Sequence, residues 1–327
     1  MRIAVLCSPD SWYFRDLRRA ADSQHELLPV AFTQLASVLG EGDQITARQV
    51  ALGLVPGGSD VDDPAPRARF TGGPATRSGA TGNISLSDVD ALLVRTMPPG
   101  SLEQVVFRMD LLARLEASGV PVVNPPKAIE AAVDKYLTSA RLAAAGLKIP
   151  RTIVCQTADD AMTGFAELGG DVVLKPLFGS EGRGITRLTD EALALRAFKM
   201  LDQLGAVLYL QEFIDHDGSD LRLLVIGERV LGMRRRNPLD WRTNVSRGAT
   251  AEPLEVTPEL AELAHRAAEV VGAPLAGVDL LPGRDGQLYA IEVNAVPGWK
   301  ALARAQGIDV ARLVLEFIES RSTDQCQ

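Results

Sequence analysis

Residues 277–299 read GVDLLPGRDGQLYAIEVNAVPGW, and their pattern predicts a β-hairpin. Two apolar runs are separated by a turn rich in glycine and proline at residues 282–286. Side chains alternate between the two faces of a strand, so Glu292 and Asn294 should project from one face together with Ala290. The pattern therefore gathers polar side chains on one face of the second strand.

The expected register brings a third polar residue close to this pair. We expect Leu281 to pair with Leu288 across the turn. Asp279 then has Glu292 as its diagonal neighbour, roughly 7–8 Å away between backbones, a gap that long polar side chains can bridge. With Asn294 they offer hard oxygen ligands without His or Cys, which suits Mg²⁺ or Mn²⁺ bound together with substrate phosphates. The hairpin alone leaves a second interpretation open, an edge hairpin whose acids are solvated.

The composition limits the class of protein. With 327 residues, 46% of them apolar and 23% charged, the chain is long enough for two or three domains and has the balance of a soluble globular protein. A net charge of −8 argues against a general nucleic-acid partner. No segment approaches the roughly 20 apolar residues of a membrane span, so no membrane partner is expected. Cys7, Cys155 and Cys326 are odd in number and far apart, which favours a reducing compartment, and we expect a cytoplasmic protein.

The order of apolar runs and breaks predicts three units. Residues 1–126 alternate strands with amphipathic helices, as in a small α/β domain, interrupted at residues 53–83 by a glycine- and proline-rich insertion without apolar periodicity. A helix over residues 128–145 opens the central unit, residues 127–206, and the hairpin belongs to the last unit, residues 207–327.

A glycine-rich loop follows one strand of the central unit. The strand at residues 171–175 ends in a lysine and runs into residues 176–184, PLFGSEGRG. Glycines let backbone amides approach phosphate oxygens closely, and the lysine supplies a compact positive charge for the same phosphates. The loop is not a Walker motif, because no Gly-Lys-Ser/Thr follows and the next element is a strand. By itself it fits an ordinary tight turn as well as a phosphate loop.

Five segments in a fixed order are more specific. They are VVLKPLFGSEGRGI, LQEFI, DLRLLVIGERV, RRNPLDWRTNVSRGA and GVDLL...YAIEVNAVPG. Together they resemble the ATP-grasp ligases, most closely the RimK-type α-L-glutamate ligases, from about Ala128 to the C-terminus. The resemblance implies an α/β protein of the α+β ATP-grasp kind: an N-terminal α/β pre-ATP-grasp domain followed by two α+β subdomains that clamp ATP.

The resemblance also implies which residues bind the nucleotide. The matching positions are Lys135, Lys175, Gly179, Ser180, Gly182, Gly184, Glu212, Phe213, Asp220, Arg242 and Asn244. The lysines would contact the ATP phosphates, and the glycine loop would fold over them. Glu212 and Phe213 would meet the adenine, largely through backbone atoms, while Asp220 would bind the ribose. Without the other motifs, Phe213 fits a core residue of a strand better.

The reaction centre is implied in the same way. The catalytic residues would be Lys175, Arg242 and Arg247, and the ligands of two Mg²⁺ or Mn²⁺ ions would be Asp279, Glu292 and Asn294. Arg247 matches an arginine suited to a developing acyl phosphate. Family members often have His-Arg-Gly-Gly where this chain has SRGA at residues 246–249, which leaves the acceptor open.

The activity implied by the resemblance is that of an ATP-dependent carboxylate–amine ligase. A substrate carboxylate would attack the γ-phosphate of ATP, and an amine would displace phosphate from the acyl phosphate to form an amide, releasing ADP and phosphate. The partners would be ATP, an amino acid, for which we expect L-glutamate, and a carboxylate-bearing acceptor, either a small cofactor or a protein or peptide C-terminus. We also expect a homo-oligomer, a dimer or a tetramer.

Two other functions stay open at this point. The same nucleotide site could transfer a phosphoryl group to a final phosphorylated product, or the chain could be a non-catalytic ATP-binding regulatory protein. The first domain should shape the acceptor pocket. Arg95, at a strand end in that domain, is either an anion contact or a surface arginine.

Overall fold

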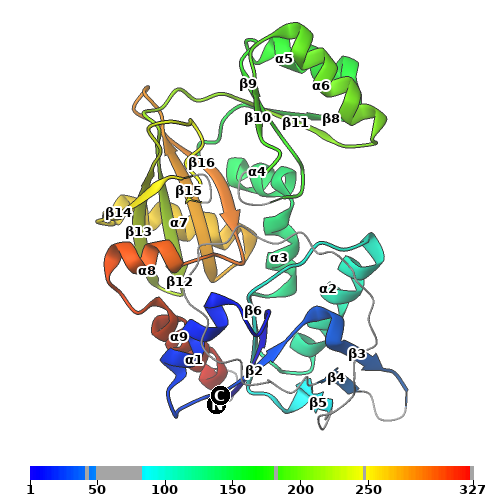
Figure 1. The fold of residues 1–327 in the computed structure, drawn as a ribbon, viewed down its shortest axis with the longest axis vertical. Helices are drawn as coiled ribbons and strands as arrows, with labels where there is room; N and C mark the ends of the chain where they lie inside the picture. The colour runs from blue at the N-terminus through cyan, green and yellow to red at the C-terminus, as the bar shows by residue number, and fades with distance from the viewer. Residues whose placement is uncertain (41–43, 49–82, 180–182, 246–247, 325–327) are drawn as a thin grey trace.

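The computed structural model describes residues 1–40, 44–48, 83–179, 183–245 and 248–324 (Figure 1). The insertion expected at residues 53–83 lies outside the described residues except for Asn83. Ser180, Gly182 and Arg247 also lie outside them. None of the helices within the described ranges is long and apolar enough to span a membrane.

A four-stranded parallel sheet forms the N-terminal unit. Its order is β2 (Glu26–Val30), β1 (Arg2–Leu6), β6 (Ala91–Val94) and β7 (Val122–Val123). Alternate residues of β1 pack on opposite faces, against α1 (Trp12–Ala21) on one side and α2 (Leu102–Ala117) on the other. The chain passes from β1 to β2 on one side and from β6 to β7 on the other, so the strand order reverses between β1 and β6.

A smaller antiparallel sheet accompanies this unit. It contains β3 (Leu35–Val38), β4 (Gln44–Arg48) and β5 (Asn83–Ser85), with short 3-10 helices at Phe32–Gln34 and Leu86–Asp88. Its inward residues Ile45, Ala47 and Ile84 join the same core as α2.

The central lobe has an antiparallel sheet of its own. The order is β10 (Thr186–Leu188), β9 (Val172–Lys175), β11 (Leu208–Glu212) and β8 (Thr152–Cys155), with α5 (Ala158–Glu167) and α6 (Glu191–Gln203) packed on it. Its buried residues form a separate hydrophobic cluster. Because β11 pairs with β8 and β9, the lobe continues past residue 206, where the sequence placed the unit boundary.

The C-terminal unit is a five-stranded antiparallel sheet. The order is β14 (Thr250–Leu254), β13 (Arg229–Arg236), β12 (Ser219–Ile226), β15 (Leu275–Pro282) and β16 (Leu288–Asn294). One face packs against α7 (Pro258–Val271), while α8 (Lys300–Gln306) and α9 (Val310–Asp324) lie toward the other, where α9 also packs on α1.

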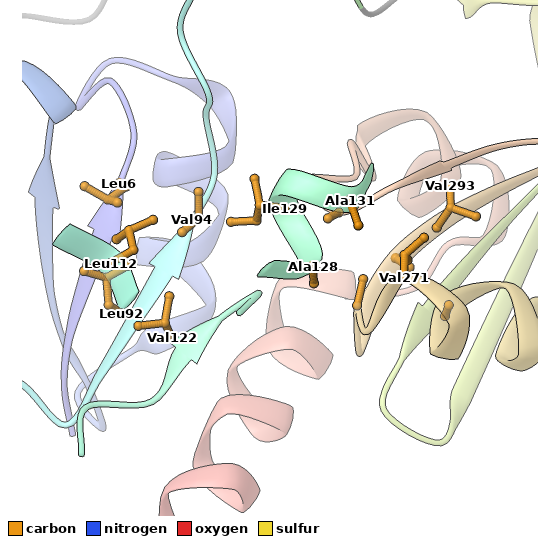
Figure 2. Close-up of a cluster of buried hydrophobic side chains, with 14 of the residues drawn as sticks. Leu6, Leu92, Val94, Leu112, Val122, Ala128, Ile129, Ala131, Val271 and Val293 are labelled. Atoms are coloured by element: carbon orange, nitrogen blue, oxygen red, sulfur yellow. The ribbon is translucent and has the colours of Figure 1, made fainter. Parts of the chain in front are cut away.

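One hydrophobic core joins the N-terminal and C-terminal units. α3 (Pro126–Val133) places Ala128, Ile129 and Ala131 between the N-terminal sheet and the C-terminal residues Val271 and Val293 (Figure 2). The cluster is continuous from one sheet to the other. The molecule therefore has two packed bodies, a joined N- and C-terminal body and the central lobe.

The single helix expected over residues 128–145 is wrong, since two helices occupy it. α3 ends at Val133 and α4 (Lys135–Ala144) begins two residues later. Asp134 lies between them in an extended conformation, and its side chain accepts a hydrogen bond from the backbone N–H of Leu137 at 3.0 Å. An aspartate that caps a new helix in this way ends the preceding one.

Candidate active site

The hairpin of β15 and β16 contains a β-bulge that the sequence analysis did not anticipate. Leu280 pairs with Ala290, but the next pair is Asp279 with Glu292, so Ile291 is the extra residue. Asp279 therefore lies directly opposite Glu292, and the diagonal relation and the pairing of Leu281 with Leu288 were wrong. A bulge adds one residue to one strand and shifts the register beyond it.

The bulge also reverses the faces expected for β16. Ala290 and Val293 are buried in the large core with Val278, which neighbours Asp279 along β15. Glu292 and Asn294 instead share a face with Asp279, so the expectation that they project together with Ala290 was wrong. The extra residue lets β16 bury an apolar residue on one face and present two polar ones on the other.

Two buried arginines hold Asp279. Arg222 on β12 is the register partner of Asp279, and its Nη1 donates to Oδ1 at 2.6 Å. The Nη2 of Arg235 on β13 lies 3.0 Å from the other carboxylate oxygen. Burial opposes ionisation of Asp279, but the two guanidinium groups outweigh it and hold the pKa of this carboxyl below its usual range. Asp279 is therefore a fixed negative charge.

A glycine makes room for Arg222. A Cβ built on Gly277 would lie 2.6 Å from the Cζ of Arg222, so any larger residue would push the guanidinium aside. Gly277 is also the register partner of Asn294. The glycine thus keeps the arginine within reach of Asp279.

Asp220 joins the same network from β12. It is buried, and Arg235 donates to both of its oxygens, from Nε at 2.7 Å and from Nη2 at 2.5 Å. The hydroxyl of Thr243 also donates to it. Arg235 therefore bridges Asp220 and Asp279. The ribose contact implied for Asp220 stays a prediction, on a carboxylate that already has these partners.

Lys175 ends β9 and reaches toward Glu292 from the central lobe. Its Nζ donates to the Oε1 of Gln211 at 2.5 Å. Burial lowers the pKa of Lys175 to about 8, while the charge of Glu292 acts to raise it. An ammonium and a carboxylate from different lobes thus lie close enough to influence each other, so the lysine expected to contact phosphate lies within electrostatic reach of the candidate metal ligand Glu292.

Lys135 approaches the same place from α4. Its Nζ donates to the carbonyl of Gly179 at 2.8 Å and lies 3.5 Å from that of Leu177. Burial lowers its pKa, and Glu292 again counteracts this. The loop glycine Gly184 has a φ of +74°, in the left-handed region that glycine adopts without strain. The structure therefore brings both lysines and the described part of the loop together.

The expected adenine contacts lie at the end of β11. The backbone N–H groups of Glu212 and Phe213 donate to the carbonyls of Arg151 and Asp171. These two N–H donors already have protein partners. An adenine that contacts Glu212 and Phe213 would therefore donate hydrogen bonds to backbone carbonyl oxygens there. The Phe213 ring is half-buried and carries the guanidinium of Arg187 at 3.4 Å from its centroid. Phe213 is therefore not a fully buried core residue.

Arg242 and Asn244 lie in the segment after β13. Arg242 pairs with Asp240 through Nη2 at 2.7 Å, and its Nη1 lies 3.5 Å from the carbonyl of Ile185, which follows the glycine loop. Asn244 is half-buried beside Thr243. Arg242 thus connects the C-terminal unit to the central lobe. Arg247 lies outside the described residues, and the role implied for it stays a prediction.

Sequence reasoning missed three residues of the site, Arg222, Arg235 and Gln211. In β13 neighbouring side chains face opposite sides, and Arg235 is buried while Arg236 is exposed. The ion pairs of Arg222 and Arg235 depend on strand pairing, which a single sequence does not display.

The donor set fits a hard divalent cation. Asp279 and Glu292 face each other across the strands, and Asn294 follows on the same face. Within the described ranges no group of three or more His, Cys, Asp or Glu side chains is placed to hold a metal, so the protein ligands here would be two carboxylates and the Asn294 amide oxygen. An ionised carboxylate has about four acceptor positions, so the arginine contacts of Asp279 leave capacity for a cation.

Comparison with known proteins gives consistent results. A family model described as a RimK-like ATP-grasp domain matches residues 132–318. The tetrahydromethanopterin:alpha-L-glutamate ligase of Methanosarcina acetivorans is 36% identical over 280 residues, covering 76% of this chain and 86% of the relative. The glutamate–LysW ligase ArgX of Sulfurisphaera tokodaii is 30% identical over 243 residues, covering 72% and 84%.

A solved structure shares the fold along almost the whole chain. The structure of the ATP-grasp ligase PsnB complexed with minimal precursor, Mg and ADP matches with a TM-score of 0.70. It covers 98% of this chain and 97% of the other, at 20% identity, so the likeness concerns the fold alone.

Proposed function

The chain belongs to the RimK-like ATP-grasp family and is an ATP-dependent ligase that forms carbon–nitrogen bonds, and we propose that it joins L-glutamate to an acceptor carboxylate. The observation that carries this proposal is that Lys175, at the end of β9, lies within electrostatic reach of Asp279 and Glu292, which face each other on the C-terminal sheet. Cationic groups for phosphates and oxygen ligands for a divalent cation thus lie at one place.

Each residue has a role in this proposal. Lys135 and Lys175 bind the ATP phosphates, and the loop containing Gly179 and Gly184 covers them. Arg222 and Arg235 keep Asp279 ionised and oriented. These groups act by positioning and charge stabilisation, because phosphoryl transfer requires little covalent chemistry from the protein.

We propose that the site binds two divalent cations, Mg²⁺ or Mn²⁺, and that Asp279, Glu292 and Asn294 would hold them. When bound, the cations would neutralise charge on the phosphate oxygens.

The proposed reaction has two steps. The acceptor carboxylate attacks the γ-phosphate of ATP, which releases ADP and leaves an acyl phosphate, with Arg242 and Arg247 assigned to stabilise the transferring group. The amine of glutamate then displaces phosphate from the acyl carbon, loses a proton and forms the amide. Both carboxylates of the glutamate remain free in the product.

The relatives support glutamate more than any one acceptor. One is named for tetrahydromethanopterin and another for LysW, yet both names contain glutamate. The SRGA segment at residues 246–249 differs from the His-Arg-Gly-Gly expected from the family, in agreement with a different acceptor. We therefore propose either a small cofactor or a protein or peptide C-terminus as acceptor.

Mass spectrometry of the products tests this function. The enzyme is incubated with ATP, Mg²⁺, isotopically labelled L-glutamate and a small-molecule and peptide extract. The expected product is an acceptor heavier by one labelled glutamyl unit, with stoichiometric ADP. A phosphorylated product formed without glutamate would instead indicate a phosphotransferase.

A Glu292→Gln variant tests the proposed metal site. It keeps the size and polarity of the side chain and removes the charge that faces Asp279 and influences Lys175. We expect turnover to fall by about 10²-fold or more, because one preorganised charged group at a reaction centre is typically worth that much. Full turnover of this variant would exclude the proposed metal site.

A further inference from the structure

Arg95 lies where open α/β sheets place their ligands. It directly follows β6 and therefore stands at the carboxyl end of the N-terminal sheet, where the strand order reverses between β1 and β6. α1 and α2 cover opposite faces of the sheet on either side of this point. A crevice between the carboxyl ends of strands at such a reversal is the usual binding position in this class of sheet.

The side chain is buried and incompletely satisfied. Arg95 is 7% exposed, so the surface arginine considered from the sequence is wrong. Its Nη2 donates to the carbonyl of Pro297 at 2.7 Å, while Nε and Nη1 have no hydrogen-bond partner among the described residues and no contact with solvent. Trp299 and Tyr13 lie against it, with ring centroids 4.1 and 4.8 Å from Cζ. Buried N–H donors without a partner are costly, so they indicate that a bound ligand supplies the acceptor.

No anion of the described chain neutralises this charge. The other buried arginines of the site, Arg222 and Arg235, are paired with carboxylates. The titratable neighbours of Arg95 are Tyr13 and Cys7, and burial raises the pKa of the Cys7 thiol to about 12, so it stays neutral. Burial lowers the pKa of Arg95 only to about 10, so the guanidinium keeps its charge at neutral pH. An unpaired buried charge is costly to maintain unless a ligand uses it.

The position connects directly to the proposed reaction centre. Pro297, the carbonyl partner of Arg95, comes three residues after Asn294, whose Oδ1 accepts a hydrogen bond from the N–H of Val296 at 2.9 Å. Of the two rings that contact the Arg95 guanidinium, that of Trp299 is fully buried and that of Tyr13 is half-buried.

We propose that Arg95 binds a carboxylate of the amino-acid substrate at the carboxyl end of the N-terminal sheet. The inference rests on the proposed function, in which L-glutamate presents an amine for reaction and two free carboxylates for recognition. Lys135 and Lys175 are assigned to phosphates, so recognition of a substrate carboxylate requires a further cation. Arg95 supplies it, with N–H donors that are already oriented and dehydrated.

Calorimetric titration tests this site without turnover. L-glutamate is titrated into the enzyme with a non-hydrolysable ATP analogue and Mg²⁺, for the wild type, Arg95→Gln and Arg108→Gln. Arg108 is the matched control, because it is 6% exposed, has no ion pair among the described residues, donates to the Pro98 carbonyl at 2.7 Å and lies 5.4 Å from the Phe32 ring. We expect Arg95→Gln to weaken glutamate binding by about 10- to 100-fold and Arg108→Gln to leave it unchanged.

Amide analogues separate recognition from a structural role. Wild type should bind glutamate more tightly than glutamine or isoglutamine, and Arg95→Gln should lose the preference over one of the two, which identifies the carboxylate. Equal loss of affinity for all three ligands, or the same loss in Arg108→Gln, would overturn the proposal. If Arg95→Gln does not fold, Arg95→Met replaces it, and an unchanged preference for glutamate in that neutral variant would also overturn the proposal.

The two proposals can fail separately. Binding of glutamate that depends on Arg95, without any amide product, would contradict the proposed ligation and leave this site standing. Amide formation by a wild-type enzyme whose glutamate affinity is unaffected in Arg95→Gln would contradict this site alone.

Discussion

Lys175 is the residue at which burial most directly sets the pH dependence. Its pKa lies near 8, below its ordinary value of 10.5, because burial disfavours the ammonium. The charge that binds phosphate is therefore present below this pH and lost as pH rises through it. We expect kcat/KM for ATP to decline by about tenfold per pH unit above about pH 8, as one deprotonation requires.

The profile of a Lys175→Met variant serves as the control. It should be weak at every pH and lack the inflection near 8, because it has no ammonium to lose. A wild-type kcat/KM that stays level from about pH 7 to pH 10 would exclude a requirement for the charged form.

Gly277 gives a second prediction at the scale of one residue. In Gly277→Ala the new Cβ would meet the Cζ of Arg222 at 2.6 Å. We expect a loss of about 1–3 kcal/mol in the free energy of unfolding, as for other overpacked sites. Displacement of Arg222 from Asp279 should also raise the Mg²⁺ concentration needed for half-maximal turnover. Denaturant unfolding and an Mg²⁺ titration measure the two effects.

A double-variant cycle shows whether Arg222 causes the effect. In an Arg222→Ala background the Cβ at Gly277 has room, so the added cost of Gly277→Ala should nearly vanish. Simple additivity of the two costs would mean that the steric contact is not responsible.

Single residues differ in how far the sequence reveals them. Asp279, Glu292 and Asn294 could be predicted as one polar group because strand periodicity and oxygen chemistry are local properties. Arg222 could not, because its partner Asp279 is 57 residues away and meets it only through strand pairing. Arg95 could be named but not interpreted, since its burial depends on Trp299, far along the chain.

At the scale of elements, the N-terminus of α4 links helix capping to nucleotide binding. Asp134 caps this helix at the N–H of Leu137, and Lys135 is its first residue. We expect Asp134→Ala to lower the free energy of unfolding by about 0.5–2 kcal/mol. The KM for ATP should rise several-fold, because the lysine loses its fixed position. Unfolding curves and steady-state kinetics report the two quantities.

Thr257 provides a matched cap elsewhere. It caps α7 through the same relation, accepting from the N–H of Leu260 at 3.3 Å. Thr257→Ala should cost a similar free energy and leave the KM for ATP unchanged. If both variants raised KM alike, general destabilisation would explain the effect of Asp134→Ala.

Elements were predictable where local signals were complete. Sequence reasoning suits α7, where a proline start, apolar periodicity and a terminal glycine all mark the observed bounds. It failed at the bulge near Ile291 and at the break before α4. The position of a bulge depends on which side chains are buried on each face of the sheet. The periodicity of one strand does not contain that information.

At the scale of the whole molecule, the separate core of the central lobe predicts uneven stability. Its apolar cluster is distinct from the core shared by the other two units. We expect amides of β9 and β11 to exchange hydrogen through an opening of lower free energy than amides of β1 and β12. A non-hydrolysable ATP analogue should raise the protection of the lobe. Equal free energies of exchange in all four strands would show a single cooperative unit.

The placement of α3 bears on how this enzyme could be recombined with its relatives. Ala128, Ile129 and Ala131 complete a core on both sides, yet they precede residue 132, where the family match begins (Figure 2). A chimaera cut at residue 132 would separate an apolar helix from one of its two partners. A graft of the central lobe would leave this core intact, and besides the two chain crossings it would have to match polar contacts such as those of Lys135 with Gly179 and of Arg242 with Ile185. Exchange of lobes between homologues should therefore yield soluble hybrids, whereas exchange of the N-terminal unit must carry α3 and its facing residues with it.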